Sequence, residues 1–397
     1  MTETSALTGV RILELAHYIA GPQACQILAD HGADVVKIEP PGGEPGRRAR
    51  PLKDDESLYF ASHNRGKRSI ELDLRTEAGR EVLADLVGWA DALVTNYAKG
   101  VPERLGFGFE QVQRLNPELV MVHITGFGQS GPYADWVAFD GIVQAMSGLA
   151  HVTGQPGGPP TLAGPYIGDH VAAMQGAMGC VLGLQARTHG QGGQLVDVSM
   201  LDGLLSTMGH HMAQVDLGEP EPGRLGNSPV GVFSDTFATT DGWVYLAPVT
   251  LGMWERLCDV VGHPEWWQEE LAEPGWRIQH KERLTRELAS WTAERTRRQV
   301  VDAMQAQGIV CGPVNAVSDL LADAQLDHRG MLAPLDLGGG LAVTLPGVPV
   351  RLSATPARRN TSRPEVGEHS AELLEGALGY RDEQLERARS VTRGQEE

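Results

Sequence analysis

A single acidic residue, Asp169, stands where a loop rich in glycine and proline gives way to a run of small apolar residues. The loop spans residues 154–168 and residues 171–186 have the composition of a packed helix, so we expect Asp169 to be the helix N-cap. There its carboxylate would accept backbone N–H groups and lie in the positive end of the helix dipole, which keeps it ionised. A carboxylate held this way at the mouth of a pocket can attack an activated acyl group as a nucleophile. The alternative is a purely structural cap, which the local pattern alone favours because such caps are common.

Seven basic residues gather in one loop region of an otherwise acidic chain. Arginine binds phosphate through two parallel hydrogen bonds and lysine binds it as a point charge, so this basic cluster suits the phosphates of a nucleotide-like ligand. A solvated surface is the alternative interpretation. Arg104, which follows the loop at residues 96–100, adds a positive charge at the same predicted ligand edge. The basic cluster consists of Arg47, Arg48, Arg50, Lys53, Arg65, Lys67 and Arg68.

Three other motifs do not support the chemistry that they first suggest. Residues 126–131 match G-x-G-x-x-G, but Pro132 and Tyr133 follow where a phosphate-binding helix should begin, which argues against a dinucleotide site. His210 and His211 are adjacent, so on a helix they point about 100° apart and form no bidentate metal site. The four cysteines lie far apart without C-x-x-C spacing, which predicts reduced cysteines that pack in the interior.

Length and charge limit the class of protein. A chain of 397 residues exceeds one comfortable hydrophobic core, so we expect two domains. The formal charge of -18 and the pI near 5.2 oppose binding to nucleic acid or to an anionic membrane. The N-terminus lacks the basic and apolar regions of a signal peptide, and no run of about 18 apolar residues occurs. These features predict a cytoplasmic protein that neither crosses a membrane nor binds nucleic acid.

The first 130 residues alternate β-rich runs with helical patterns, which predicts βαβ units and a largely parallel sheet. Ligands bind such sheets beyond the carboxyl ends of the strands, so the loops at residues 16–22, 96–100 and 126–133 are candidate ligand contacts. The expected strands are residues 10–15, 34–39, 69–73, 91–95 and 119–125, and the expected helices between them include residues 23–30 and 78–87.

The pattern changes after residue 217. Helices are expected at residues 140–149, 169–186 and 200–217, with a strand at 194–199, before a linker at 218–229. A hairpin at 233–239 and 243–247 and three helical patterns within 253–307 then predict a second, smaller core. Two amphipathic helices, at 368–378 and 381–390, end the chain.

Four further segments combine glycine with charged or polar residues: Asn64-Arg-Gly-Lys-Arg-Ser69 and the stretches at residues 190–199, 308–314 and 367–370. Together with Ala20-Gly21-Pro22, the loop at 126–133 and Gly168-Asp169, they occur in this order in the class III CoA-transferase family, which the chain resembles over nearly its whole length. This family includes formyl-CoA and carnitine CoA-transferases and the α-methylacyl-CoA racemases. The resemblance implies an α/β fold with a Rossmann-like large domain from residues 1–222 and 328–397, a smaller α+β domain at 223–327, and an interlocked homodimer.

The resemblance also implies a reaction and its substrates. CoA would pass between an acyl-CoA thioester and a small free carboxylic acid, with Asp169 as the catalytic nucleophile that forms first a mixed anhydride and then an aspartyl-CoA thioester. CoA and acyl-CoA are substrates, and neither a metal nor a permanently bound cofactor is implied. Backbone N–H groups near Asp169 would stabilise the developing oxyanions.

Coenzyme A contacts follow by position from the same resemblance. Ile19 replaces a glutamine of formyl-CoA transferase, Pro40 replaces its arginine, and its glycine-rich gating loop is missing, so oxalate and formate are not expected substrates. The carnitine-transferase type of small domain fits better. The implied CoA-binding residues are Ile19, Ala20, Leu72, Asp73, Leu74, Arg75, Asn96, Tyr97, Ala98, Lys99, Arg104 and Asp140.

Two alternatives to transfer remain. The racemase branch of the family places a histidine before the aspartate at position 140, where this chain has Phe139, and residues 247–251 lack the acid expected on the opposite side. Two-sided proton transfer needs a base and an acid on opposite faces, so we favour transferase over racemase. The other alternative is a CoA-binding protein without turnover, in which Asp169 only caps its helix.

Overall fold

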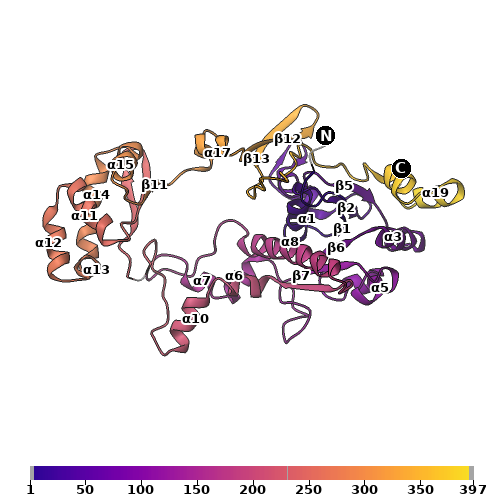
Figure 1. Ribbon diagram of the computed structural model, residues 1–397, viewed down its shortest axis with the longest axis horizontal. Helices are drawn as coiled ribbons and strands as arrows, with labels where there is room; N and C mark the ends of the chain where they lie inside the picture. The colour runs from indigo at the N-terminus through magenta and orange to yellow at the C-terminus, as the bar shows by residue number, and fades with distance from the viewer. Residues whose placement is uncertain (1–3, 230, 393–397) are drawn as a thin grey trace. The chain divides into compact units, whose positions relative to one another are not determined.

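The computed structural model describes residues 4–229 and 231–392, and its contacts divide the chain into two compact units (Figure 1). The large unit combines three stretches of chain, one ending at Ala150, one running Leu162–Glu219 and one beginning at Gln325. The small unit contains His151–Thr161 and Pro220–Ala324. The structure therefore groups residues 151–161 with the small unit, whereas the sequence-based division kept them in the large domain.

The large unit contains a six-stranded sheet in which neighbouring strands are parallel. The chain builds from β1 to β2 and β5 on one side and then crosses to β6, β7 and β8 on the other, so the order reverses between β1 and β6. Ligands bind open parallel sheets at the carboxyl ends of the strands beside such a reversal. The predicted α/β fold with a parallel sheet is confirmed. In sheet order, the strands are β5 (Arg68–Glu71), β2 (Asp34–Glu39), β1 (Arg11–Leu15), β6 (Ala92–Thr95), β7 (Val120–Thr125) and β8 (Leu195–Ser199).

Helices cover both faces of this sheet. On one face α1 (Ala20–Asp30) and α8 (Ile167–Thr188) bury alternate strand residues such as Ile12 and Val122. On the other, α3 (Glu77–Trp89) and α5 (Phe109–Leu115) bury their neighbours, such as Leu13. Strands covered on both faces need nearly continuous apolar runs, which is the pattern seen in the sequence. Helix α8 lies along β7 (Figure 1), and a Cβ at Gly183 would come within 2.6 Å of Val120 Cγ1, so this close packing requires glycine.

Several connecting elements differ from those expected. The helix predicted at residues 200–217 is two helices, α9 (Met200–Leu205) and α10 (Gly209–Asp216), and the helix predicted at 140–149 is α6 (Asp140–Met146) followed by α7 (Leu149–Val152). An antiparallel pair, β12 (Leu332–Gly338) and β13 (Leu341–Pro346), lies in a region without a predicted element. The remaining elements are η1 (Pro45–Arg48), β3 (Leu52–Lys53), β4 (Glu56–Ser57), α2 (Leu58–His63), α4 (Val101–Leu105), α16 (Val317–Leu320), α17 (Ala324–His328), α18 (Ser370–Glu372), η2 (Leu373–Ala377) and α19 (Asp382–Arg389).

The small unit has its own hydrophobic core, built around Trp254, Trp266 and Phe237. The predicted hairpin is present as β9 (Asp235–Thr239) and β10 (Gly242–Leu246), and β11 (Cys311–Pro313) pairs antiparallel with β10. Five helices, not three, lie between Leu251 and Gln305. They are α11 (Leu251–Val261), α12 (Pro264–Ala272), α13 (Trp276–Gln279), α14 (Lys281–Ala293) and α15 (Arg297–Gln305).

The four cysteines, Cys25, Cys180, Cys258 and Cys311, are buried and form no disulfide, as predicted. Across residues 4–229 and 231–392, no helix is both long enough and apolar enough to span a lipid bilayer.

Candidate active site

A cavity of about 860 Å³ lies in the large unit where the loops that follow β1 and β6 meet the end of β7. Its walls come from these strand-end loops, from the segments before α6 and α8, and from α2. The cavity therefore occupies the edge of the sheet where the strand order reverses. Asp169 lines it, together with His17, Tyr18, Ala20, Tyr59, Asn96, Tyr97, Ala98, Lys99, Phe139, Asp140 and Tyr166.

Asp169 is the third residue of α8, not its N-cap. The N-cap is Tyr166, and no side chain caps the helix, so the interpretation of Asp169 as a structural cap is wrong. Its carboxylate instead accepts a hydrogen bond from the backbone N–H of Ala20, at the start of α1. The side chain is thus directed at a neighbouring loop and at the cavity.

The protonation state of Asp169 also differs from the expected one. Burial, followed by repulsion from the Asp140 carboxylate, raises the pKa of Asp169 to about 7, and the hydrogen bond from Ala20 opposes this rise. Desolvation and a like charge both disfavour the ionised form, and here they outweigh the helix dipole. The prediction that the dipole keeps Asp169 fully ionised is wrong, because a carboxyl with this pKa is about half protonated at pH 7.

Asp140, the first residue of α6, is buried beside the start of α8. Its Oδ1 accepts a hydrogen bond from the Gly168 N–H at 2.7 Å, and its Oδ2 accepts one from Gln144 Nε2 at 2.6 Å. Gln144 Oε1 in turn accepts the Ala163 N–H at 2.8 Å. These bonds fix the segment that leads to Asp169, and they occupy both carboxylate oxygens of Asp140.

The rings of Tyr59 and Tyr166 line the cavity together with Asp169, and a pair of histidine rings lies nearby on α2 and α8. The rings of His63 and His170 lie 5.7 Å apart, and those of Tyr59 and Tyr166 lie 6.3 Å apart. Burial lowers the pKa of His63 to about 4 and also lowers the pKa of His170, so both rings are neutral at pH 7. Sequence reasoning missed Tyr59 and His63, because nothing in the local pattern links α2 to the strand-end loops.

The predicted CoA-binding residues divide between two cavities. Ala20, Asn96, Tyr97, Ala98, Lys99 and Asp140 line the large one. A second cavity of about 290 Å³ is lined by Leu72, Asp73, Leu74 and Arg75 together with Pro40 and Pro41. Tyr97 lines both cavities, so the two share a wall. Arg104, exposed on α4, and Ile19, which is buried, line neither.

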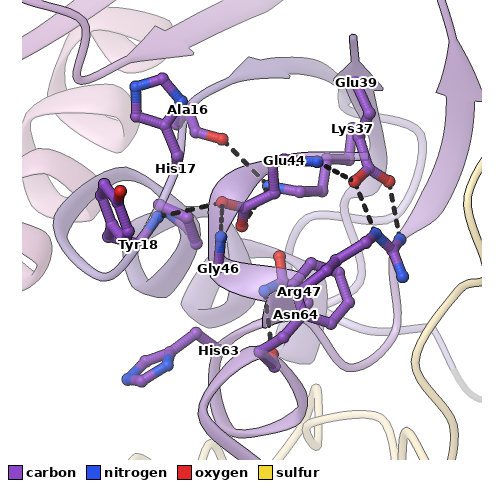
Figure 2. Close-up of polar contacts among 12 residues, drawn as sticks. Ala16, His17, Tyr18, Lys37, Glu39, Glu44, Gly46, Arg47, His63 and Asn64 are labelled. Atoms are coloured by element: carbon purple, nitrogen blue, oxygen red, sulfur yellow. Dashed lines mark hydrogen bonds and ion pairs between the residues drawn. The ribbon is translucent and has the colours of Figure 1, made fainter. Parts of the chain in front are cut away.

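Most of the basic cluster is occupied by ion pairs within the fold. Lys67 Nζ lies 2.7 Å from Glu14 Oε2, and Arg65 Nη2 lies 2.7 Å from Asp30 Oδ2, with all four side chains buried. Arg47 contacts Glu39 at 2.7 Å (Figure 2), and Arg68 contacts Asp34 at 2.5 Å. The interpretation of these four residues as phosphate ligands is therefore wrong. Within residues 4–229 and 231–392, no group of three or more His, Cys, Asp or Glu side chains is placed to hold a metal ion.

Known proteins share both the sequence pattern and the fold. The pattern of CoA-transferase family III matches residues 7–370. The chain is 36% identical to the succinyl-CoA:mesaconate CoA-transferase of Haloarcula hispanica, covering 94% of this chain and 96% of that protein. It is 34% identical to a formyl-CoA:oxalate CoA-transferase of Rhodopseudomonas palustris, covering 96% of each. The crystal structure of a CaiB/BaiF family protein from Brucella suis superposes with a TM-score of 0.85 at 31% identity, covering 94% of this chain and all of that one.

Proposed function

The chain belongs to CoA-transferase family III and is an enzyme, and we propose that it moves CoA from an acyl-CoA to a free carboxylic acid through covalent intermediates on Asp169. One observation carries the proposal: Asp169 lines the large cavity at the sheet edge where the strand order reverses, and its half-buried position raises the pKa of its carboxyl to about 7. Such a group is more basic than an ordinary carboxylate, hence a stronger nucleophile, yet it remains substantially ionised at neutral pH.

The proposed reaction proceeds through four displacements. The Asp169 carboxylate attacks the thioester carbonyl, the C–S bond breaks, and a mixed anhydride and CoA thiolate form. The thiolate attacks the Asp169 carbonyl of the anhydride, which releases the donor acid as a carboxylate and leaves an aspartyl-CoA thioester. The acceptor carboxylate attacks that thioester to give a new anhydride and thiolate. The thiolate then attacks the acceptor carbonyl, which yields the new acyl-CoA and regenerates the Asp169 carboxylate.

The two cavities support a binding mode for the CoA substrate. We infer that the pantetheine arm lies in the large cavity and the nucleotide in the smaller one, with Tyr97 at their shared wall. Arg75 and Lys99 provide the positive charges nearest to these cavities, although each is paired with an acid, Asp73 at 2.8 Å and Asp135 at 3.2 Å. Arg104 adds an exposed charge on the neighbouring α4.

Replacement of the nucleophile tests the proposal. We expect Asp169→Ala to abolish CoA exchange between acyl-CoA and carboxylic acids while CoA binding, measured by calorimetry, stays within a few-fold of wild type. Asp202→Ala is the matched control, because Asp202 is also the third residue of its helix but is exposed and does not line the cavity. Unimpaired exchange in Asp169→Ala, or wild-type protein that never carries a hydroxylamine-sensitive acyl group on Asp169 during turnover, would contradict the proposal.

The substrates and the racemase alternative can be examined with the same protein. Incubation with a panel of carboxylic acids and succinyl-CoA or acetyl-CoA, followed by mass spectrometry for new thioesters, identifies donor and acceptor together. For the alternative, we expect no uptake of solvent deuterium at the α carbon of a 2-methylacyl-CoA above background. Phe139, the N-cap of α6, gives the cavity no ionisable group at the position of the racemase histidine.

A further inference from the structure

The loop at residues 16–19, between β1 and α1, is held through its backbone by side chains from three other segments of the large unit. The Ala16 carbonyl accepts a hydrogen bond from Lys37 Nζ at 3.0 Å. Asn96 binds both backbone groups of His17, at 2.9 Å and 2.7 Å. The Tyr18 N–H donates to Glu44 Oε2 at 3.4 Å (Figure 2). We call residues 16–19 the β1–α1 loop.

Tyr18 is the strained point of the β1–α1 loop. Its φ of 65° lies in the left-handed region, which a bulky residue adopts only when its surroundings hold it there. Glu44 is the side chain that binds its N–H, and the same oxygen also accepts the Gly46 N–H at 2.7 Å. The Glu44 carboxylate is therefore the contact that holds the backbone N–H of Tyr18 itself.

Glu44 is itself fixed by a buried network of charges. Its Oε1 lies 3.4 Å from Lys37 Nζ, and Lys37 also contacts Glu14 at 2.6 Å. All three side chains are almost fully buried. Burial alone would lower the pKa of Lys37, but Glu14 and Glu44 raise it above its ordinary value, so the ammonium stays charged. Glu44 consequently cannot move without leaving a buried charge with fewer partners.

The β1–α1 loop ends at Ala20, whose N–H donates to the Asp169 carboxylate. We propose that Glu44 is a positioning residue for Asp169, which acts by holding Tyr18 in the left-handed conformation and so aims the Ala20 N–H at the nucleophile. The inference rests on the proposed function of Asp169. Without Glu44 the Ala20 N–H loses its alignment, the ionised carboxylate loses a stabilising donor, and burial and Asp140 act on it unopposed.

Other ionisable groups interact with Asp169 or line the cavity beside it. They are Asp140 on α6, Tyr59 on α2 and Tyr166 before α8. None of these residues is a hydrogen-bond or ion-pair partner of Glu44, so we expect a Glu44 variant to leave them in place. A difference between wild type and a Glu44 variant in the titration of Asp169 therefore reports on the β1–α1 loop.

The experiment compares Glu44→Gln and Glu44→Asp with wild type by infrared titration of Asp169. The carbonyl band of the protonated carboxyl is assigned by its loss in Asp169→Asn, and its intensity is followed against pH. We expect the midpoint to rise by about one pH unit in Glu44→Gln, as loss of one hydrogen bond to a charged acceptor implies. Asp30→Asn is the control: it breaks the buried pair with Arg65 but does not touch the β1–α1 loop, and should leave the midpoint unchanged.

Turnover provides the second measurement. In Glu44→Gln we expect kcat to fall about tenfold at pH 6 and to recover towards wild type at pH 9, with KM for acyl-CoA unchanged within twofold. A uniform loss of kcat at all pH values, or an unshifted infrared midpoint in the folded variant, would overturn the inference.

The test gives a clear result even if Glu44→Gln does not fold or if the proposed function of Asp169 is wrong. Glu44→Asp retains the negative charge but is one methylene shorter, so if Glu44→Gln does not fold, a smaller upward shift of the midpoint in Glu44→Asp still supports the inference and no shift refutes it. The infrared titration needs no substrate. If wild type forms no acyl adduct on Asp169, the proposed function fails, whereas an unshifted midpoint alongside normal adduct formation rejects only the role of Glu44.

Discussion

Interactions that favour the ionised carboxylate and interactions that favour the neutral acid oppose each other at Asp169. The first turn of α8 and the Ala20 N–H favour the carboxylate, whereas the surrounding protein and Asp140 favour the neutral acid. The second pair prevails because desolvation acts on the whole charged group, while the helix dipole contributes at most about 2 kcal/mol. A near-neutral pKa is the result, and it has consequences for both rate and stability.

The pH dependence of acylation follows from this pKa. Only the ionised carboxylate attacks, so the single-turnover rate of adduct formation should rise about tenfold per pH unit below a midpoint near 7 and level off above it. Single-turnover mass spectrometry with succinyl-CoA measures this step without interference from product release. A flat profile between roughly pH 5.5 and 8 would show that the carboxyl titrates elsewhere.

The free energy of unfolding should also depend on the ionisation of Asp169, but it should be highest where the carboxyl is protonated. The pKa of Asp169 is about 7 in the folded chain and about 3.8 when unperturbed, so between these values the folded state alone holds the proton. The free energy of unfolding therefore falls as pH rises through this window, and the loss is complete above pH 7. We expect Asp169→Asn to be more stable than wild type at pH 8, by up to about 4 kcal/mol, and nearly equal to it below pH 4.

Denaturant melts of both proteins at the two pH values measure this difference. Asp202→Asn serves as the exposed control and should match wild type throughout. An Asp169→Asn variant that is less stable than wild type at pH 8 would mean that the fold stabilises the half-buried carboxylate and does not destabilise it.

The ion pairs of the basic cluster predict how single substitutions change the free energy of unfolding. Lys67→Ala leaves Glu14 with Lys37 as its one remaining cationic partner, so it should lower the free energy of unfolding by about 3–5 kcal/mol. Lys53→Ala, an exposed member of the same cluster, should change it by less than about 0.5 kcal/mol. Equal stabilities in chemical denaturation would refute the structural role that the ion pairs assign to Lys67.

At the level of secondary-structure elements, the sequence was most informative where packing is periodic. The predicted strand at residues 34–39 is β2 without change, and β1, β6, β7 and β8 begin one residue later than expected, because buried parallel strands require continuous apolar runs. Elements that depend on distant partners were missed: α2 and the β12–β13 pair have no such run. The candidate nucleophile could be located from the loop-to-helix transition, but its electrostatic partner Asp140 lies 29 positions earlier and meets it only through the bond to Gly168.

The close contact between α8 and β7 predicts how a methyl group added to this helix would change the stability of the protein. A methyl group at position 183 would overlap Val120, whose β-branched side chain on a strand has little freedom to move. Gly183→Ala should therefore destabilise the protein by about 1–3 kcal/mol despite the better helix propensity of alanine. Gly88→Ala is the matched control on α3, where nothing lies within 4 Å of the added atom, and it should stabilise by up to about 1 kcal/mol. Thermal melts that show the same sign for both variants would contradict the close packing of α8.

At the scale of the whole molecule, α8 has an exposed apolar face, which a monomer would leave in contact with water. Met174, Met178 and Leu182 are spaced by four residues, so they share one face of the helix, and they are 55%, 57% and 60% exposed. Met212 and Val215 on α10 are exposed as well. Exposed apolar surface of this kind marks an interaction site, which fits the homodimer that the resemblance to the family implies.

The last prediction concerns an interlocked homodimer, in which the two subunits would be linked as rings. Sedimentation should give twice the chain mass of 42.7 kDa. If the two subunits are linked as rings, dissociation requires one of them to open, so two purified dimers with different tags should not exchange subunits under native conditions, even at nanomolar concentration. Unfolding and refolding the mixture should then produce the hybrid, since the chains can thread anew. A dimer joined by the α8 surface alone would exchange on simple dilution, because its affinity then rests on one reversible interface. In that case Met178→Glu, which places a charge in the apolar patch, should yield a folded monomer, whereas a linked pair would remain a dimer.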